Sequence, residues 1–78
     1  MLQSRGKNFL FTDFIAILKA FGFKLDRING SHHIYIHKKT CRMISVQSDG
    51  KDSKPYQIKQ FVKIVEQLNL KMEEIIYD

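Results

Sequence analysis

The sequence predicts an α+β fold: a two-layer sandwich of the order α-β-β-β-α, with two helices on one face of an antiparallel three-stranded sheet. Two stretches, near the start and the end of the chain, carry apolar residues at helical spacing, and three strand-like segments lie between them. The connections between these segments are too short for a crossover, so we expect antiparallel neighbours. One face of the sheet is the only surface large enough to cover both apolar helix faces.

The first helix is predicted by apolar residues three and four positions apart: Phe11, Phe14, Leu18 and Phe21. Thr12, followed by the acidic residue Asp13, is the expected N-cap, because its hydroxyl can accept a hydrogen bond from a free backbone N–H. Gly22 is expected just beyond the last turn, where a left-handed backbone favours glycine.

Three segments have the composition of strands, at about residues 23–27, 32–38 and 42–47. The turn pair Asn29-Gly30 separates the first two. In the third, Ile44 and Val46 alternate with polar neighbours, as expected for a strand with one buried face. The three segments therefore predict a meander.

The second helix is expected to follow a polar loop at residues 48–54. Pro55 suits the first turn, where its missing N–H costs nothing, and Asn69 is a suitable terminator. The apolar stripe of this helix is formed by Ile58, Phe61, Val62, Val65 and Leu68. Residues 1–8 are expected to be flexible, and residues 71–78 to form a C-terminal extension with a short extra helical turn.

Composition narrows the class of protein. The 78 residues suffice for a single domain over residues 1–78. The one cysteine, Cys41, allows no intramolecular disulfide, which favours a reducing compartment. No apolar run approaches the ~20 residues of a membrane helix, and residues 1–8 lack the features of a signal peptide. We therefore expect a cytoplasmic protein with no membrane partner.

Positive charge is concentrated in the middle of the chain. The net charge is +5, and residues 24–63 carry nine basic and three acidic side chains. This imbalance favours a polyanionic partner such as RNA. An ordinary solvated basic surface explains the charge equally well, so charge alone does not indicate an enzyme.

Neither a metal centre nor a nucleophilic cysteine is predicted. His33 and His37 would lie ~13 Å apart along a strand, too far to share an ion, and His32 and His33 point to opposite faces. Cys41 lies among basic residues, but the sequence pairs no base with it. We expect no metal and no small-molecule cofactor.

General acid–base chemistry is the remaining option, and it points to His32. This residue begins the second strand directly after a tight turn, where a side chain can meet a ligand while the sheet anchors the backbone. Imidazole exchanges protons near neutral pH. The residues alone leave a second interpretation open, in which His32 only satisfies the turn by hydrogen bonding.

Gly30, Ser31 and His32 open the second strand, and the aromatic residue Tyr35 stands three positions after the histidine. This Gly-Ser-His motif resembles that of the HicA toxins, small RNA-cleaving proteins of bacterial toxin–antitoxin pairs. Segments 21–25 and 54–61 are similar to the helix-to-strand junction and the second-helix entry of HicA proteins. The resemblance covers about residues 9–70. The predicted element order also resembles the double-stranded-RNA-binding domain.

The resemblance implies a HicA-like toxin, a metal-independent endoribonuclease that cleaves mRNA and is neutralised by a HicB antitoxin. It implies that His32 is catalytic, either taking a proton from the RNA 2′-hydroxyl or protonating the 5′-oxygen, while Gly30 and Ser31 form the turn and Tyr35 is structural. We expect His33 and His37 to be exposed strand histidines. Candidates for contact with RNA phosphates are the basic residues Arg27, Lys38, Lys39, Arg42 and Lys54.

Two alternatives stay open. Ile34 and Ile36 share a strand face with His32, which would turn that face towards the core, whereas the resemblance places Tyr35 inward and His32 outward. We follow the resemblance. A non-catalytic RNA-binding module of the same fold is the alternative function, and new 5′-hydroxyl ends on RNA would distinguish an enzyme from it.

Overall fold

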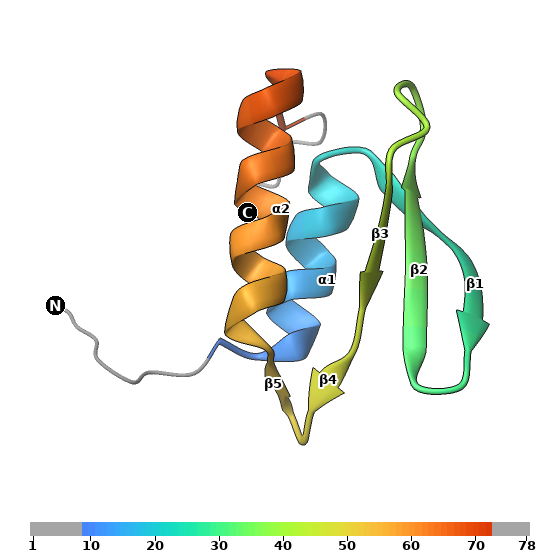
Figure 1. The fold of residues 1–78 in the computed structure, drawn as a ribbon, viewed down its shortest axis with the longest axis vertical. Helices are drawn as coiled ribbons and strands as arrows, with labels where there is room; N and C mark the ends of the chain where they lie inside the picture. The colour runs from blue at the N-terminus through green and yellow to red at the C-terminus, as the bar shows by residue number, and fades with distance from the viewer. Residues whose placement is uncertain (1–8, 73–78) are drawn as a thin grey trace, which may run out of the picture.

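The computed structural model describes residues 9–72 and confirms the predicted α+β arrangement (Figure 1). Two helices lie on one side of an antiparallel sheet with the strand order β1-β2-β3. The main elements are α1 (Phe11–Ala20), β1 (Phe23–Asn29), β2 (His32–His37), β3 (Met43–Val46) and α2 (Pro55–Leu68). The predictions for residues 1–8 and for most of the 71–78 extension lie outside the described residues.

The start of α1 differs from the prediction, and its end agrees with it. The N-cap is Leu10 and no side chain caps the helix, so the predicted Thr12 cap is wrong and Thr12 lies within the first turn. The backbone N–H of Phe11 instead donates to the carbonyl of Lys51 at 2.9 Å. At the other end, Gly22 follows the C-cap with a φ of 95°, the left-handed conformation predicted for it.

The Lys51 carbonyl belongs to a small hairpin that the sequence did not predict. Residues 48–54 were expected as a loop, but they contain β4 (Ser48–Asp49) and β5 (Asp52–Ser53), paired antiparallel. Two-residue strands are too short to show a periodic pattern in sequence. The N–H of Ser53 donates to the carbonyl of Phe9 at 2.7 Å, so the hairpin joins the segment before α1 to the segment before α2.

The turn between β1 and β2 lies one residue later than the Asn29-Gly30 pair and coincides with the Gly30-Ser31 turn that the resemblance implies. Asn29 still belongs to β1, where it pairs with His32, and the loop consists of Gly30 and Ser31. Gly30 has a φ of 65°, and a Cβ built on it would meet nothing within 4 Å. Backbone conformation rather than space therefore explains the glycine.

Helix α2 has the predicted ends, and four of the five residues of its predicted apolar stripe face the core: Phe61 is buried, and Ile58, Val65 and Leu68 pack against the core. Pro55 stands in the first turn, and the C-cap Asn69 is left-handed, with φ 54° and ψ 44°. The buried residues of the helix are Gln57, Phe61 and Ile64. Val62, predicted as part of the apolar stripe, is 47% exposed instead. The polar side chain of Gln57 occupies the inner position one turn before Phe61.

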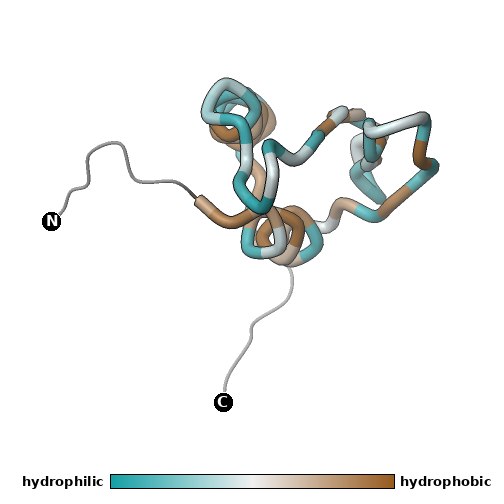
Figure 2. The backbone as a smooth tube through the Cα atoms, turned by 90° about the horizontal axis from the view of Figure 1, so that it is seen from below, coloured by the Kyte–Doolittle hydropathy of each residue, from teal (hydrophilic) through white to brown (hydrophobic). Residues whose placement is uncertain are grey.

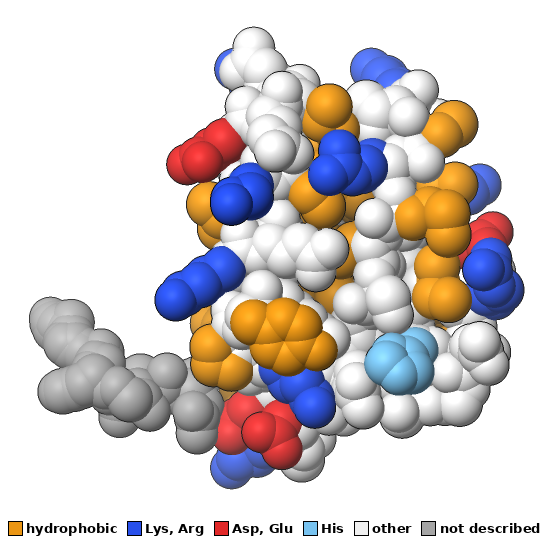
Figure 3. All heavy atoms as spheres, viewed as in Figure 1, with side chains coloured by type: hydrophobic (Ala, Val, Ile, Leu, Met, Phe, Trp, Pro, Cys, Tyr) orange, Lys and Arg blue, Asp and Glu red, His pale blue; other side chains and the backbone are white. Residues whose placement is uncertain are grey.

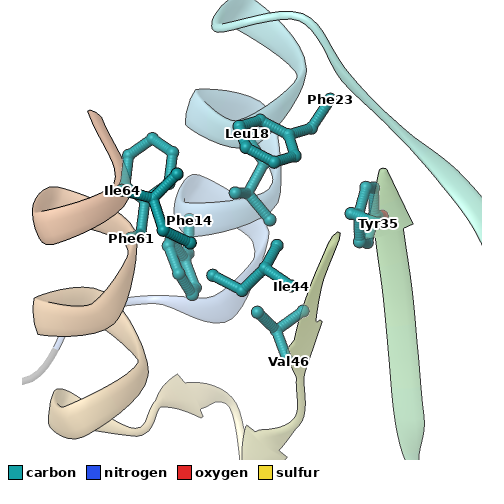
Figure 4. Close-up of a cluster of buried hydrophobic side chains, with 8 residues drawn as sticks. All are labelled: Phe14, Leu18, Phe23, Tyr35, Ile44, Val46, Phe61 and Ile64. Carbon is teal, nitrogen blue, oxygen red and sulfur yellow. The ribbon is translucent and has the colours of Figure 1, made fainter. Parts of the chain in front are cut away.

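The core lies between the sheet and the two helices (Figure 4). It contains side chains from both helices and all three long strands: Phe14, Leu18, Phe23, Tyr35, Ile44, Val46, Phe61 and Ile64. Phe61 contacts the rings of Phe14, Phe21 and Phe23 edge-on, at centroid distances of 5.4–6.0 Å. Seen from below, the two helices lie on the same side of the sheet (Figure 2). Within residues 9–72, neither helix has the length and apolarity needed to cross a bilayer.

Candidate active site

The histidine of the Gly-Ser-His segment is the first residue of the central strand and is exposed. His32 pairs with Asn29 of β1, and the next residue, His33, pairs with Val46 of β3. The backbone of His32 is therefore fixed at the entry to the sheet, while its side chain remains accessible. Figure 1 shows that this end of β2 lies at the same end of the molecule as the start of α2.

The two faces of β2 are now distinguished. Tyr35 is 4% exposed and belongs to the core, so His32 faces away from the helices, as the resemblance implied. Ile34 and Ile36 share the outer face with His32. Ile34 is nevertheless only 9% exposed, and Ile36 is half-buried, because neighbouring strands flank both residues. Burial raises the pKa of the Tyr35 phenol above its ordinary value of 10.0.

Two side chains from the neighbouring strand segment contact the Gly-Ser-His turn. The Oγ of Ser45 lies 3.3 Å from the Nδ1 of His32. The amide Nε2 of Gln47 donates to the Oγ of Ser31 at 3.2 Å. The Ser45 contact orients the imidazole ring of His32, and the Gln47 contact fixes Ser31, the residue before it. Nε2 is then the ring nitrogen of His32 that is left to reach a ligand.

A buried glutamine connects this turn to α2. Gln57 is 3% exposed, and its Oε1 accepts the backbone N–H of Gln47 at 3.0 Å. Its Nε2 donates to the hydroxyl of Tyr56 at 3.4 Å. Gln57 therefore satisfies a backbone amide just beyond β3 and links the first turn of α2 to the residue that contacts Ser31.

These supporting residues were not predicted from the sequence, although two patterns in the sequence point to Ser45 and Gln57. The alternation of Ile44 and Val46 already placed Ser45 on the face opposite the core. Gln57 lies four residues before Phe61, at a position where a buried polar residue is unusual. The strand register, which brings Ser45 to His32, cannot be read from composition.

The other two histidines differ from the prediction that both are exposed. His37 is 3% exposed, and its Nδ1 accepts the backbone N–H groups of Lys39 and Thr40, both at 3.1 Å. Its ring contacts Phe23 edge-on at 5.0 Å. His33 is half-buried against Phe11, and its Nδ1 is buried without a hydrogen-bond partner. Both face the helices because they alternate with His32 along the strand.

The basic candidates fall into two groups. Arg27 pairs with Ile34, so it lies on the outer face one strand away from His32, and it forms an ion pair with Asp26. Lys54 is the N-cap of α2, at the same end of the molecule as His32. The remaining three, Lys38, Lys39 and Arg42, belong to the connection at the other end of β2, about 16 Å or more from His32 along the strand.

No group of three His, Cys, Asp or Glu side chains within residues 9–72 is arranged to hold a metal ion. Cys41 is an exposed free thiol in the β2–β3 connection, at the opposite end of β2 from His32.

The hydrogen bonds described above bring together the Gly-Ser-His turn, Ser45, Gln47 and the first turn of α2. Figure 3 shows a histidine side chain on this side of the molecule, with Lys or Arg and hydrophobic side chains nearby.

One protein family matches most of the described chain. A family described as "HicA toxin of bacterial toxin-antitoxin" matches residues 11–70, from the start of α1 to just beyond α2. The chain belongs to the HicA toxin family. It is therefore the toxin of a toxin–antitoxin system, and an antitoxin is its partner. Searches of curated proteins and of solved structures returned no significant match. The HicA match includes the Gly-Ser-His turn, β3 and Gln57.

Proposed function

We propose that this HicA toxin is a metal-independent endoribonuclease that cleaves mRNA, with His32 as its catalytic residue, and that a HicB antitoxin neutralises it. The observation that carries the proposal is the setting of His32. It is exposed at the entry of the central strand, and Ser45 contacts its Nδ1 at 3.3 Å. A ring that is anchored at one nitrogen and open at the other suits proton transfer to a substrate.

The chemistry needs only proton transfers. Nε2 of His32 takes the proton of an RNA 2′-hydroxyl, and the 2′-oxygen attacks the adjacent phosphorus while the bond from phosphorus to the 5′-oxygen breaks. The leaving 5′-oxygen takes a proton from solvent water, and His32 returns its proton to solvent, which gives a 5′-hydroxyl end and a 2′,3′-cyclic phosphate. Because the nucleophile belongs to the substrate, it is already positioned, and DNA, which lacks it, is not cleaved.

Ser45 suits either role of His32. Its hydroxyl can donate to an unprotonated Nδ1 or accept from a protonated one, so the contact persists when the ring gains or loses a proton. Arg27 and Lys54 are the basic candidates nearest to His32 along the fold, and their positive charge would offset the charge that develops on the phosphoryl oxygens. A HicB antitoxin that covers this end of the sheet would block the reaction.

The test is incubation of purified toxin with RNA in the presence of a chelator, followed by labelling of new 5′-hydroxyl ends. We expect cleavage by the native protein. The variant His32→Ala should lose it by at least about 100-fold, the usual contribution of a general acid or base, while its circular dichroism spectrum and RNA affinity stay unchanged. His33→Leu is the matched control, because His33 faces the helices and should leave cleavage intact.

Two results would contradict the proposal. Full cleavage by His32→Ala would remove the catalytic role of His32. RNA retained by the native protein without any new ends would instead favour the non-catalytic RNA-binding module. Addition of HicB antitoxin should stop cleavage in proportion to the toxin bound, and cleavage at saturating HicB would contradict the neutralisation.

A further inference from the structure

Tyr56 differs from every other phenylalanine or tyrosine that the structure describes. Its side chain is 62% exposed, whereas the other seven between residues 9 and 72 are buried or half-buried. It stands in the first turn of α2, directly after Pro55. A single exposed apolar side chain is ordinary on a protein surface, so exposure alone decides nothing. The contacts of Tyr56 are what distinguish it.

The phenol is connected to the catalytic turn by a series of hydrogen bonds. Its hydroxyl accepts from Nε2 of the buried Gln57 at 3.4 Å, and Oε1 of Gln57 accepts the N–H of Gln47 at 3.0 Å. Gln47 in turn donates to Ser31 at 3.2 Å, next to His32. The hydroxyl is thus engaged at the rim of the ring, and the exposed area of the side chain leaves ring surface open to solvent. That hydrogen bond restrains the ring before a flat ligand stacks on it.

Two basic residues flank Tyr56 along the chain, and the acidic residue before it, Asp52, belongs to β5 and lies outside the helix. Lys54 precedes the helix, and the exposed Lys59 lies three residues after Tyr56, on the same side of α2. The first turn of α2 contains no acidic residue, so the partial positive charge of the helix N-terminus is not offset there. An aromatic ring between cations is the arrangement with which proteins bind a nucleobase and its flanking phosphates.

We propose that Tyr56 stacks on an unpaired base of the RNA, close to the phosphodiester whose cleavage His32 promotes, and that the substrate is therefore single-stranded. The inference rests on the proposed function, since it assigns a base-binding position to the same site. A base within a duplex is already stacked between its neighbours and cannot lie on Tyr56, so only unpaired RNA satisfies the ring and His32 together.

The experiment separates binding from cleavage by using the His32→Ala variant as background. Its affinity for a fluorescein-labelled, unstructured 12-nucleotide RNA is measured by fluorescence anisotropy. Adding Tyr56→Ala should weaken binding by about 5- to 150-fold, the usual loss when one stacking ring is removed. Tyr56→Trp should restore it. Val62→Ala is the matched control, because Val62 is a 47% exposed apolar residue of the same helix.

A second arm uses the same RNA annealed to its complement. Tyr56→Ala should change the affinity for this duplex by less than about twofold, because phosphate contacts remain and no base is available to stack. Thermal unfolding of each variant is measured alongside, so that a loss of stability from unpairing Nε2 of Gln57 is distinguished from a loss of binding. Equal affinities of Tyr56→Ala and its parent for single strands would overturn the proposal, as would an equal loss on both RNAs or a loss that Tyr56→Trp fails to restore.

The outcomes also distinguish this proposal from the nuclease itself. If native toxin cleaves RNA and Tyr56→Ala cleaves it with the same kcat/KM, the stacking role is wrong and the nuclease stands. If the anisotropy losses appear but native toxin produces no new 5′-hydroxyl ends, the stacking role stands and the nuclease is wrong. A Tyr56→Ala variant that loses affinity for the antitoxin and keeps it for RNA would assign the ring to the protein partner and overturn the proposal.

Discussion

Replacement of the buried glutamine in α2 by leucine provides a sharp test of how the site is supported. Gln57→Leu keeps a side chain of similar volume at a position that is 3% exposed. It removes the acceptor of the Gln47 N–H and the donor to the Tyr56 hydroxyl. Leaving a buried donor without its partner costs about 1–3 kcal/mol, and the added apolar burial offsets part of this.

We therefore expect the free energy of unfolding to fall by about 1–2 kcal/mol. For a domain of this size, that corresponds to a melting temperature about 4–16 °C lower. Urea and thermal unfolding, followed by circular dichroism, measure the change. Cleavage should also decline, because Gln47 no longer has a fixed backbone from which to contact Ser31.

Gln60→Leu is the matched control for this substitution. Gln60 is an exposed glutamine of the same helix, and its replacement should change the free energy of unfolding by no more than about 0.5 kcal/mol. If Gln57→Leu proves as stable as Gln60→Leu, the hydrogen bonds of Gln57 contribute nothing to the fold. If it is less stable but cleaves RNA at the native rate, Gln57 supports the fold and not the site.

Two further substitutions test single features of the backbone and core. Because burial raises the pKa of Tyr35, the native state holds the phenol proton more tightly than the unfolded chain does, and the free energy of unfolding should fall as pH rises above about 10. Tyr35→Phe should therefore lose less free energy of unfolding between pH 8 and pH 11, as measured by urea titrations. An equal loss in the two proteins would argue against the raised pKa. Cys41 has a φ of 63°, which is unfavourable for a residue with a Cβ. Cys41→Gly should therefore raise the free energy of unfolding by about 0.5–1 kcal/mol, and Cys41→Val should lower it. Thermal unfolding measures both variants, and the reverse order of stability would contradict this account.

Most of the fold was predictable because its elements are governed by local patterns. The spacing of Phe14 and Leu18, the proline at the start of α2 and the left-handed Asn69 each act within one turn of chain, and each was confirmed. The wrong predictions concern features that depend on distant residues. The N-cap of α1 was misplaced because a backbone carbonyl from the later hairpin, at Lys51, takes the place of a side-chain cap.

The candidate site shows the same division between local and distant effects. The turn and the position of His32 at a strand entry follow from a few neighbouring residues. The burial of His37 does not, because it depends on Phe23 of another strand and on the amides of the following turn. The roles of Ser45 and Gln57 depend on strand register and on the rotation of α2, which only the packed core determines.

In β3, the packing of the core also determines the geometry of the candidate site. Ile44 and Val46 are 1% and 0% exposed, and the residue between them, Ser45, must then point to the outer face. A slip of one residue would place both apolar side chains in solvent and remove Ser45 from His32. The free energy that excludes this slip is the burial of two large aliphatic side chains, roughly 3–6 kcal/mol. The contact between Ser45 and His32 is exposed and weak by itself, yet it is enforced by the burial of its neighbours.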